Sequence, residues 1–371
     1  MILGIDVSTY LEQQRIAKPI YKKDGQEIDP FALFRKNGVT HLRTRIWNNP
    51  YSSKGQPYLG GTCDLDNYLD LCEKLAPYGF KQVVDFHYSD FWVDPSKQKC
   101  PKAWKDLTFE QVEEQIYLYT KDCLLKMKDR GIDVDMIQTG NEVTHGMVWP
   151  FGKLNFDSDN PYGNFAKLLI SARKACKEIY PHAKIIIHLE ESWNIHLYRH
   201  TLTELIKNGL EIDILGTSYY PFWHHSFDEY FACLEMVKKE FNIPVMNVEL
   251  GYPFTLDDYL KEADLEGRNH MAINISMKDS FKEILPYDVS PLGQAQFIKK
   301  FIELGKEHQL LGAFYWEPLW IPGKGICWAS EAGQKYQNLF MKDTRNEWSN
   351  QCLFDYEGNM LPAFDEYKME N

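Results

Sequence analysis

Two glutamates stand where apolar segments of the chain end, and their side chains could do acid–base chemistry. Glu142 closes the segment 135–142 as the second member of an Asn-Glu pair, and Glu249 lies at the end of the segment 244–250. Asn and Glu are both depleted from strands, so the pair is a poor way to continue a buried strand. A carboxylate placed there could be a helix N-terminal charge, a salt-bridge partner or a catalytic acid.

Other acidic side chains also lie near the ends of apolar segments. They are Asp85, Glu190 or Glu191, and Glu317. A buried arginine is costly unless it is paired, so we expect Asp85, inside its apolar segment, to pair with Arg43 or Arg45. Any one of these acids is more often a structural ion-pair partner than a catalyst. A pair of glutamates that face each other is the more specific signal.

The elements that must position these side chains alternate along the chain. Short apolar runs occupy residues 2–8, 40–47, 81–88, 135–142, 184–190, 213–220, 244–250 and 311–317. Between them, apolar residues recur at helical spacing, and Thr108 with Gln111 forms a capping box before one such segment. Strands alternating with helices indicate parallel pairing with right-handed crossovers. Eight such units predict an α/β fold, a closed (β/α)8 TIM barrel. No linker or composition break interrupts them, so we expect a single catalytic domain over 1–371.

The predicted connections differ in length. Segments that lead from a helix back to a strand are short, whereas those after predicted strands 3, 4, 7 and 8 are long. Long loops in compact domains are usually functional, and in a barrel the loops after the strands share the face where active sites lie. The ten tryptophans all lie on or after predicted strands. Their flat rings suit stacking on pyranose rings; the alternative is that they pack the loops against one another.

A barrel of this kind places the ends of its fourth and seventh strands across one mouth. Glu142 and Glu249 can therefore point into the same cleft. A facing carboxylate pair is the minimal apparatus for glycoside hydrolysis, in which one group protonates the leaving oxygen and the other attacks or activates water. Like charges in a partly apolar cleft also separate the two pKa values, which leaves one group protonated as an acid.

Beyond the pair itself, the chain resembles glycoside hydrolase family 53, the arabinogalactan endo-β-1,4-galactanases, over nearly its whole length. The matching segments are GIDVS, LRTRIWNNP, GGTCDLD, DFHYSDFWVDPSKQKCPKAW, IQTGNEVTHGMVWPFGK, GTSYYPFW, ELGYP, FYWEPLWIPG and QCLFDYEGN. Glutamates after strands 4 and 7, the first within Asn-Glu, mark the retaining (β/α)8 glycosidase clan. The segment that begins DFHYSDFW is specific to the family.

The resemblance implies a role for each matching residue. Glu142 would be the general acid/base and Glu249 the nucleophile of a double displacement with net retention. Asn141 would bind the 2-hydroxyl of the sugar, and Arg45 would hold the nucleophile. The further residues implied to bind substrate are His87, Trp92, Tyr219, Trp316 and Trp320. Retaining geometry predicts carboxyl groups about 5–5.5 Å apart.

Composition limits the partners of the chain. Its 371 residues carry 41 Lys and Arg against 53 Asp and Glu, a formal net charge of −12. That field repels a phosphate backbone, and no basic run offsets it, so we expect no nucleic-acid partner. No apolar stretch approaches the roughly 20 residues of a membrane span. Eight scattered cysteines without a Cys-x-x-Cys pair favour free buried thiols over disulfides.

Metal and cofactor signals are weak. Many bacterial members of the family carry a structural calcium in the loop after strand 7. Here the candidate ligands are Asp264, Glu266, Asn269 and His270, whose spacing does not match the expected pattern. Calcium would fix the loop rather than do chemistry, so we expect no cofactor to be required. His196 and His200 lack the Glu of a zinc H-E-x-x-H motif, and GTSYY lacks the second glycine of a serine-hydrolase elbow.

The resemblance implies an endo-acting enzyme on β-1,4-galactan and galacto-oligosaccharides, the side chains of pectin. Two alternatives stay open: a clan relative that acts on another β-1,4-glycan such as mannan or glucan, and a sugar-binding barrel without catalysis. We expect a monomer. The start of the chain shows no signal peptide. Because a galactan polymer is met outside the cytoplasm, we expect an extracellular, cell-surface or periplasmic protein whose signal peptide has been removed.

Overall fold

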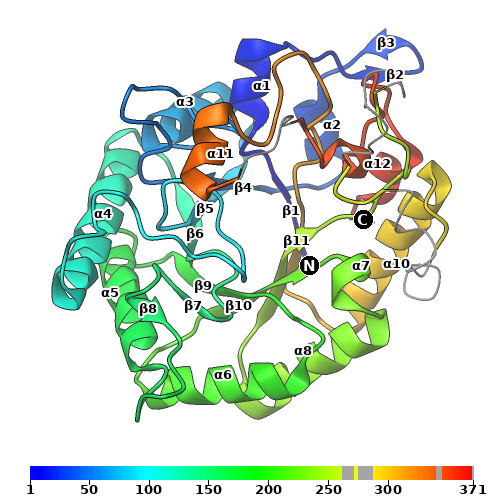
Figure 1. Ribbon diagram of the computed structural model, residues 1–371. Coiled ribbons are helices and arrows are strands. Elements are labelled where there is room, and N and C mark those ends of the chain that lie inside the picture. The colour runs from blue at the N-terminus through cyan, green and yellow to red at the C-terminus, as the bar shows by residue number, and fades with distance from the viewer. Residues whose placement is uncertain (261–270, 275–286, 340–344, 370–371) are drawn as a thin grey trace.

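The computed structural model describes residues 1–260, 271–274, 287–339 and 345–369. At its centre is a closed barrel of parallel strands, seen along the barrel in Figure 1. Around the barrel, the strands are β1 (Ile2–Asp6), β4 (His41–Ile46), β5 (Lys81–Phe86), β6 (Val134–Thr139), β9 (Lys184–Leu189), β10 (Ile214–Tyr219), β11 (Val245–Leu250) and β12 (Gly312–Tyr315), which pairs back to β1. Each overlaps one of the eight predicted runs, and the prediction of a (β/α)8 barrel is confirmed.

Amphipathic helices surround the barrel (Figure 1). They are α1 (Tyr10–Ile16), α2 (Pro30–Lys36), α3 (Leu65–Leu75), α4 (Phe109–Asp129), α5 (Gly163–Ile179), α6 (Ile195–Lys207), α8 (Phe227–Phe241) and α10 (Pro291–Glu307). Helix α4 begins at the predicted capping box of Thr108 and Gln111, and α8 begins at a second one formed by Ser226 and Glu229. Each box pairs backbone N–H groups that a helix start would otherwise leave without partners.

The loops at the carboxyl ends of the strands carry the smaller elements. These are the pair β7 (Gly146–Met147) and β8 (Gly152–Lys153), the short helices α7 (Pro221–His224) and α11 (Glu331–Gln337), and the 3₁₀ turn Ser349–Gln351. The hairpin β2 (Lys22–Lys23) with β3 (Gln26–Glu27) lies between α1 and α2, and the 3₁₀ turn Ala76–Tyr78 lies between α3 and β5. The last helix, α12 (Pro362–Glu366), packs outside the barrel against α10 and α2. The connections after β5, β6, β11 and β12 are long, as predicted, and the one from β4 to α3 is long as well.

The inside of the barrel is divided into an apolar and a polar layer. Near the amino ends of the strands, apolar side chains fill the lumen: Val83, Met136, Ile186, Ile214, Met246, Val248 and Phe314. On β1 the inward position is Gly4, where a Cβ atom would lie 2.1 Å from the Phe314 ring. Above this plug the inward positions turn polar, and they include Asp6, Arg43, Asp85, Gln138 and His188, all at most 1% exposed.

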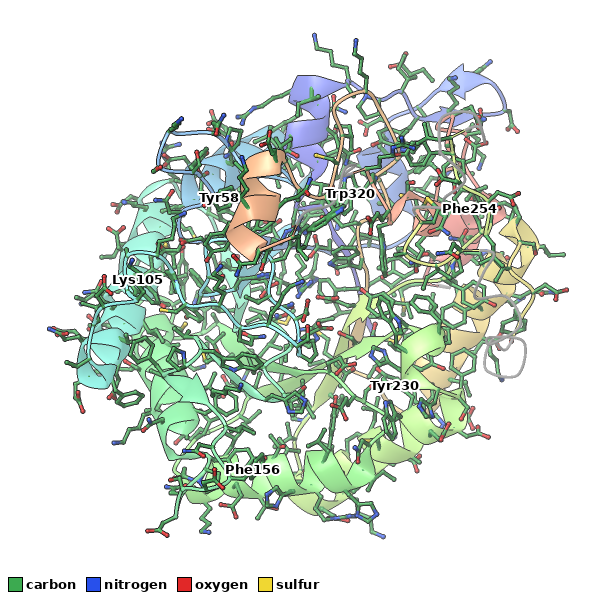
Figure 2. The ribbon with its side chains drawn as sticks, viewed as in Figure 1. Tyr58, Lys105, Phe156, Tyr230, Phe254 and Trp320 are labelled. Carbon is green, nitrogen blue, oxygen red and sulfur yellow. The ribbon has the colours of Figure 1, made fainter. Side chains whose placement is uncertain are left out.

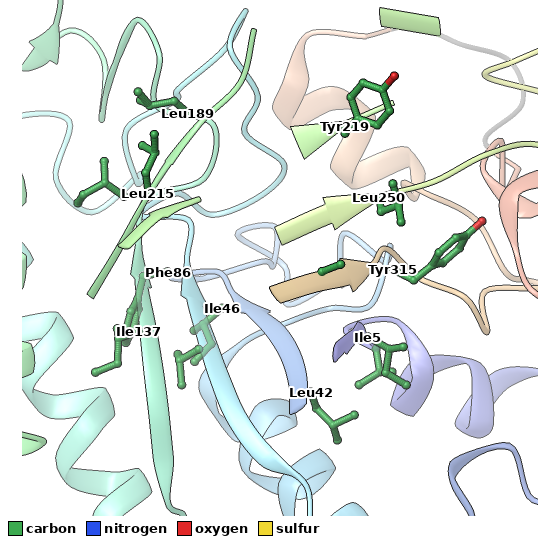
Figure 3. Packing of buried hydrophobic residues seen from close by; sticks show 14 of the residues in the cluster. Ile5, Leu42, Ile46, Phe86, Ile137, Leu189, Leu215, Tyr219, Leu250 and Tyr315 are labelled. Atoms are coloured by element: carbon green, nitrogen blue, oxygen red, sulfur yellow. The ribbon is translucent and has the colours of Figure 1, made fainter. Parts of the chain in front are cut away.

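The outward positions of the same strands form the larger core against the helices. Figure 3 shows Ile5, Leu42, Ile46, Phe86, Ile137, Leu189, Leu215, Tyr219, Leu250 and Tyr315 in this layer. Successive side chains of a strand point to opposite sides of the sheet, which places apolar residues between the polar inward ones. Tyr219 therefore belongs to the core that packs against α8 and α10, where its ring stacks on Phe297 and Phe301.

All eight cysteines are buried reduced thiols, as predicted. Within the part of the chain that the structure describes, no helix is long and apolar enough to cross a membrane.

Candidate active site

A cavity of about 260 Å³ opens at the carboxyl ends of the strands. It is lined by Arg43, Arg45, Asp85, His87, Trp92, Val93, Asp94, Lys97, Asn141, Glu142, Tyr220, Trp223, Glu249, Ala272, Trp316, Trp320, Trp328, Glu347 and Trp348. Glu142 and Glu249 are 9% and 7% exposed, so both carboxyl groups are nearly closed off from solvent but reach the cavity. The structure thus brings together the two glutamates that the sequence singled out.

A strained turn after β6 presents Glu142 to the cavity. Gly140 has φ 94° and Glu142 has φ 48°, so the chain bends through left-handed conformations directly after the strand. The Gln98 side chain fastens the turn by donating from Nε2 to the carbonyl oxygen of Asn141 at 2.8 Å. The carboxyl group of Glu142 accepts a hydrogen bond from Ser218 Oγ at 2.7 Å. A left-handed conformation at a residue other than glycine is a strain that the surrounding contacts must hold.

An irregularity in β11 places Glu249 inside the barrel. The register between β10 and β11 slips by one residue, so that Thr217 pairs with Asn247 and Ser218 with Glu249. A bulge of this kind lets Val248 and Glu249 both face the lumen, against strict alternation. Glu249 accepts hydrogen bonds from Arg43 Nη2 at 3.0 Å and from the Tyr220 hydroxyl at 2.9 Å.

The two carboxyl groups differ in how their charge is stabilised. Burial, together with the facing Glu249 and the nearby Glu190, raises the pKa of Glu142 well above its usual range. Burial also raises the pKa of Glu249, to about 7, but Arg43 and Tyr220 oppose that rise. Hydrogen bonds and a cation favour the ionised form of a carboxyl group. When the two share one proton, Glu142 therefore carries it and Glu249 is the carboxylate.

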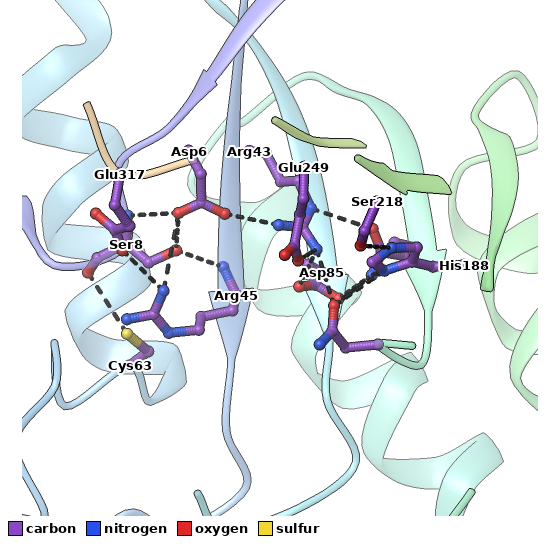
Figure 4. Close-up of polar contacts among 12 residues, drawn as sticks. Asp6, Ser8, Arg43, Arg45, Cys63, Asp85, His188, Ser218, Glu249 and Glu317 are labelled. Atoms are coloured by element: carbon purple, nitrogen blue, oxygen red, sulfur yellow. Dashed lines mark hydrogen bonds and ion pairs between the residues drawn. The ribbon is translucent and has the colours of Figure 1, made fainter. Parts of the chain in front are cut away.

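Arg43 ties the polar layer to the cavity (Figure 4). Its guanidinium lies 2.9 Å from Asp6, 2.8 Å from Asp85 and 3.0 Å from Glu249. It also donates to Asn141 Oδ1 at 3.0 Å, which orients the Asn141 side chain. One fully buried cation thus fixes both the carboxylate of Glu249 and its neighbours, because guanidinium presents its donors in a rigid fork. The expected pairing of Asp85 with Arg43 or Arg45 is confirmed for Arg43.

The expectation that Arg45 holds Glu249 is wrong. Arg45 faces the cavity from the same strand, but its guanidinium pairs with Glu317 at 2.8 Å and donates to the carbonyl oxygen of Gly60 at 2.6 Å. It also lies 4.1 Å from the centre of the Trp92 ring. The reason is distance around the barrel: Arg45 reaches toward β1 and β12, whereas Arg43 reaches across to β11. Arg45 therefore supports the Trp92 ring rather than the nucleophile candidate.

The expectation that Tyr219 lines the sugar site is also wrong. Tyr219 is the last residue of β10 and points outward, where its hydroxyl donates to the carbonyl oxygen of His225 at 3.0 Å. The next residue, Tyr220, points into the cavity and donates to Glu249. Tyr219 and Tyr220 are adjacent, and the alternation of side chains along β10 alone decides which of them faces the cavity. Since Ser218 faces inward, Tyr220 does so as well.

His87 lies in the cavity wall with both ring nitrogens engaged. Trp47 Nε1 donates to His87 Nδ1 at 3.2 Å, so Nε2 carries the hydrogen and donates to Asp85 Oδ2 at 3.1 Å. Burial lowers the pKa of His87, which keeps the ring neutral. The imidazole can meet a ligand with its face or edge, while its polar atoms hold Asp85 in place.

Indole rings form much of the cavity wall. Trp92 and Trp320 lie nearly parallel with ring centres 6.2 Å apart, and Trp316 meets the Trp348 ring edge-on. In Figure 2, Trp320 lies inside the ring of helices, whereas Phe156 is at its outer edge. Trp223, Trp328 and Trp348 line the cavity too. The remaining four tryptophans, Trp47, Trp104, Trp149 and Trp193, are not among its lining residues. Trp47 and Trp104 are buried and pack against Phe91 and Tyr119, so the loop-packing alternative holds for these two.

No metal-binding cluster is found in the described ranges, where no three His, Cys, Asp or Glu side chains are grouped to hold an ion. The calcium candidates Asp264, Glu266, Asn269 and His270 lie outside those ranges. The cavity itself is lined by carboxyl groups, a tyrosine hydroxyl and indoles. Such a site can transfer a proton and form a bond to an electrophilic carbon.

Comparison with known proteins gives consistent matches. The family described as glycosyl hydrolase family 53 matches residues 2–367. An endo-β-1,4-galactanase of Bacillus subtilis is 32% identical over 99% of this chain and 85% of its own length. An arabinogalactan endo-β-1,4-galactanase of Humicola insolens is 30% identical over 86% and 89%, respectively. The family 53 catalytic domain of Ignisphaera aggregans superposes with a TM-score of 0.87 at 33% identity, covering 99% of this chain and 95% of that one.

Proposed function

The chain belongs to glycosyl hydrolase family 53, and from this premise we propose that it cleaves internal β-1,4-galactosidic bonds of galactan and type I arabinogalactan with retention of configuration. The observation that carries the proposal is the carboxyl pair in one cavity, with two hydrogen-bond donors on Glu249 and a single hydroxyl on Glu142. The relatives at 32% and 30% identity are galactanases by name, which supports the substrate class.

The first half of the reaction uses both glutamates. The Glu249 carboxylate attacks the anomeric carbon while Glu142 gives its proton to the glycosidic oxygen, so that the C–O bond breaks and a galactosyl-enzyme ester forms. Arg43 and Tyr220 keep Glu249 ionised and aimed before the attack. These two hydrogen bonds reduce the nucleophilicity of the Glu249 carboxylate only modestly. They also fix its position, and this orientation contributes more to the rate.

In the second half, Glu142 acts as a base. The leaving chain departs and a water enters. The Glu142 carboxylate takes a proton from this water as the water oxygen attacks the anomeric carbon from the face opposite the ester bond; the bond between that carbon and the Glu249 oxygen breaks, and Glu249 is released as a carboxylate. The products have the configuration of the substrate. Asn141, held by Arg43, is our candidate for binding the 2-hydroxyl, and the rings of Trp92, Trp316 and Trp320 are candidates for stacking on sugar faces. The prediction of about 5–5.5 Å between the carboxyl groups belongs to this proposal.

A polymer substrate also bears on where the protein acts. We propose an extracellular, cell-surface or periplasmic location, because galactan is too large to be met inside the cell. Sequencing of the gene upstream of the present chain tests this by revealing or failing to reveal an export signal. A monomer suffices for the proposed reaction, since one chain supplies both carboxyl groups.

The test compares substrates and variants. Wild-type protein should release short galacto-oligosaccharides from galactan and nothing from galactomannan or cellulose; release from either of the latter favours the mannan or glucan alternative. Glu249→Ala should lose at least 10⁴-fold in turnover and still bind oligosaccharide. Azide should rescue Glu249→Ala to give an α-galactosyl azide and Glu142→Ala to give the β-azide, because each vacancy lies on a different face.

A matched control comes from a glutamate after β9. Glu191 pairs with His145 at 3.3 Å and does not line the cavity. Glu191→Gln should therefore keep turnover close to the wild-type value. Unchanged turnover of Glu249→Ala, or the same azide product from both alanine variants, would contradict the assigned roles.

A further inference from the structure

Glu142 has a dedicated hydroxyl partner that the mechanism above does not use. Ser218 lies on β10, is 0% exposed and donates from Oγ to Glu142 Oε1 at 2.7 Å. Among the described residues, no side chain or backbone group hydrogen-bonds to Oε2 of Glu142. One oxygen of the carboxyl group is thus bound and the other is left for the cavity.

A buried imidazole lies behind Ser218. His188 on β9 is 0% exposed, and its Nε2 is 2.9 Å from Ser218 Oγ (Figure 4). Its Nδ1 accepts from the backbone N–H of Glu142 at 3.3 Å. Gln138 Nε2 is 3.2 Å from the same nitrogen but donates at shorter distances to Asp85 Oδ1 and to the Gly140 carbonyl oxygen. Asn141 Oδ1 is 3.0 Å from the same nitrogen but already accepts from Arg43. The backbone N–H of Glu142 donates to Nδ1, which makes Nδ1 an acceptor and assigns the ring hydrogen to Nε2.

The tautomer sets the direction of the whole chain of bonds. With its hydrogen on Nε2, His188 donates to Ser218 Oγ. The single hydroxyl hydrogen of Ser218 is then donated to Glu142 Oε1, which acts as the acceptor. This series of hydrogen bonds therefore favours the ionised form of Glu142. His188 also contacts the backbone of the same residue, so one ring holds both ends of Glu142.

The surrounding charges act in the opposite sense on Glu142. Glu249 on β11, Glu190 after β9 and Asp94 after β5 all disfavour its ionised form, as does burial. His188 itself stays neutral, because burial and the neighbouring Arg43 lower its pKa well below the usual range; Asp85 opposes this, while His87 and His224 add to it. Against these, the hydrogen bond from the Ser218 hydroxyl lowers the pKa of Glu142 and favours its carboxylate.

We propose that Ser218 and His188 are a positioning pair for Glu142, which stabilises the carboxylate formed on proton transfer and leaves Oε2 as the oxygen that carries the proton. The inference rests on the proposed function of Glu142. When Oε2–H gives its proton to the glycosidic oxygen and the sugar C–O bond breaks, the negative charge left on the carboxyl group meets a preset O–H donor. The same donor holds the carboxylate when it later takes a proton from water.

The test is the pH profile of kcat/KM on galacto-oligosaccharide for Ser218→Ala. Without the donor, the pKa of Glu142 rises, so the alkaline limb should move up by about one pH unit and kcat should fall about tenfold. Ser218→Thr keeps the hydroxyl and should return the limb to the wild-type position. His188→Phe should move it in the same direction as Ser218→Ala, since the phenylalanine ring has no N–H and the hydroxyl loses its orienting donor.

A matched control lies one residue away on the same strand. Thr217 points outward, and its hydroxyl hydrogen-bonds with that of Tyr230 at 2.8 Å. Thr217→Val should lower stability without moving the alkaline limb. If Ser218→Ala does not fold, Ser218→Cys, with its weak S–H donor, should show a smaller shift of the same sign.

The outcomes separate this inference from the proposed function. A wild-type protein without activity on galactan overturns the proposed function itself. An active wild type whose alkaline limb stays in place in Ser218→Ala and Ser218→Cys overturns the positioning pair alone. A shift of equal size in Thr217→Val would overturn it too, because the effect would then be structural.

Discussion

At the scale of single residues, Glu142 and Glu249 share a cavity but not a hydrogen-bond environment. Glu249 meets a guanidinium and a phenol, whereas Glu142 meets one serine hydroxyl. Burial raises the pKa of both, and the stronger stabilisation of charge on Glu249 keeps its pKa the lower of the two. Two carboxyl groups of the same type thus acquire different roles from their neighbours.

The order of the two pKa values predicts a bell-shaped pH dependence. As the pH falls below the pKa of Glu249, raised to about 7, the nucleophile takes up a proton and kcat/KM falls. As the pH rises above the still higher pKa of Glu142, the acid loses its proton and kcat/KM falls again. Initial rates on a soluble galacto-oligosaccharide across the pH range measure both limbs. A profile that only rises with pH would contradict this order.

The adjacent tyrosines of β10 provide a paired test of single hydroxyls. Tyr220→Phe removes a donor from Glu249, so kcat should fall about 100-fold, and the acid limb should move to higher pH because the carboxylate is less stabilised. Tyr219→Phe removes a bond to the His225 carbonyl on the far side of the sheet. It should cost about 1 kcal/mol of stability and leave both limbs in place. Steady-state rates and thermal unfolding separate the two, and equal kinetic effects would refute the assignment.

At the scale of elements, the sequence predicts the barrel well because each strand is a short apolar run and each helix has an amphipathic period. The eight runs overlap the eight strands since this signal is local. The errors concern where a side chain points. Arg43 and Arg45 both face inward and differ only in which strand they can reach, and Tyr219 and Tyr220 differ by one step of alternation. The bulge that turns Glu249 inward depends on the pairing of β10 with β11, which no single segment encodes.

A glycine in the loop between β4 and α3 supports the position of the Trp92 ring in the cavity wall. Gly60 has φ 66°, and a Cβ there would lie 2.4 Å from the Trp328 carbonyl oxygen and 3.0 Å from Trp92 Nε1. Gly60→Ala should therefore displace the Trp92 ring and raise KM about tenfold, the loss of roughly 1.4 kcal/mol of sugar contact, with a smaller change in kcat. Oligosaccharide titration of tryptophan fluorescence measures the binding.

A second glycine of the same loop is the control for backbone strain. Gly55 has φ 73°, but a Cβ there would meet no atom within 4 Å. Gly55→Ala carries the same conformational cost, about 1 kcal/mol or more, without touching an indole. It should lower the melting temperature and leave KM unchanged. If Gly55→Ala raises KM as much as Gly60→Ala does, strain rather than displacement of Trp92 is the cause.

At the scale of the whole molecule, the barrel separates stability from chemistry. An apolar cluster fills the barrel near the amino ends of the strands, and a second apolar core lies between the strands and the surrounding helices. Buried charged side chains lie at the carboxyl ends of the strands. Each buried charge there has partners, since an unpaired one would cost several kcal/mol. The cores contain no disulfide among the eight cysteines. Packing, not cross-linking, must therefore account for stability.

Because packing rather than disulfide bonds stabilises the fold, we expect its stability to be independent of redox conditions. All eight thiols are buried, and burial raises the pKa of Cys72 and of Cys123 to about 12, so little thiolate forms at neutral pH. A thiol reagent should react slowly with the native protein and with all eight cysteines after denaturation. The melting temperature should be the same with and without a reductant. A lower melting temperature in reductant, or fewer than eight reactive thiols in the denatured protein, would show a cross-link that this packing does not contain.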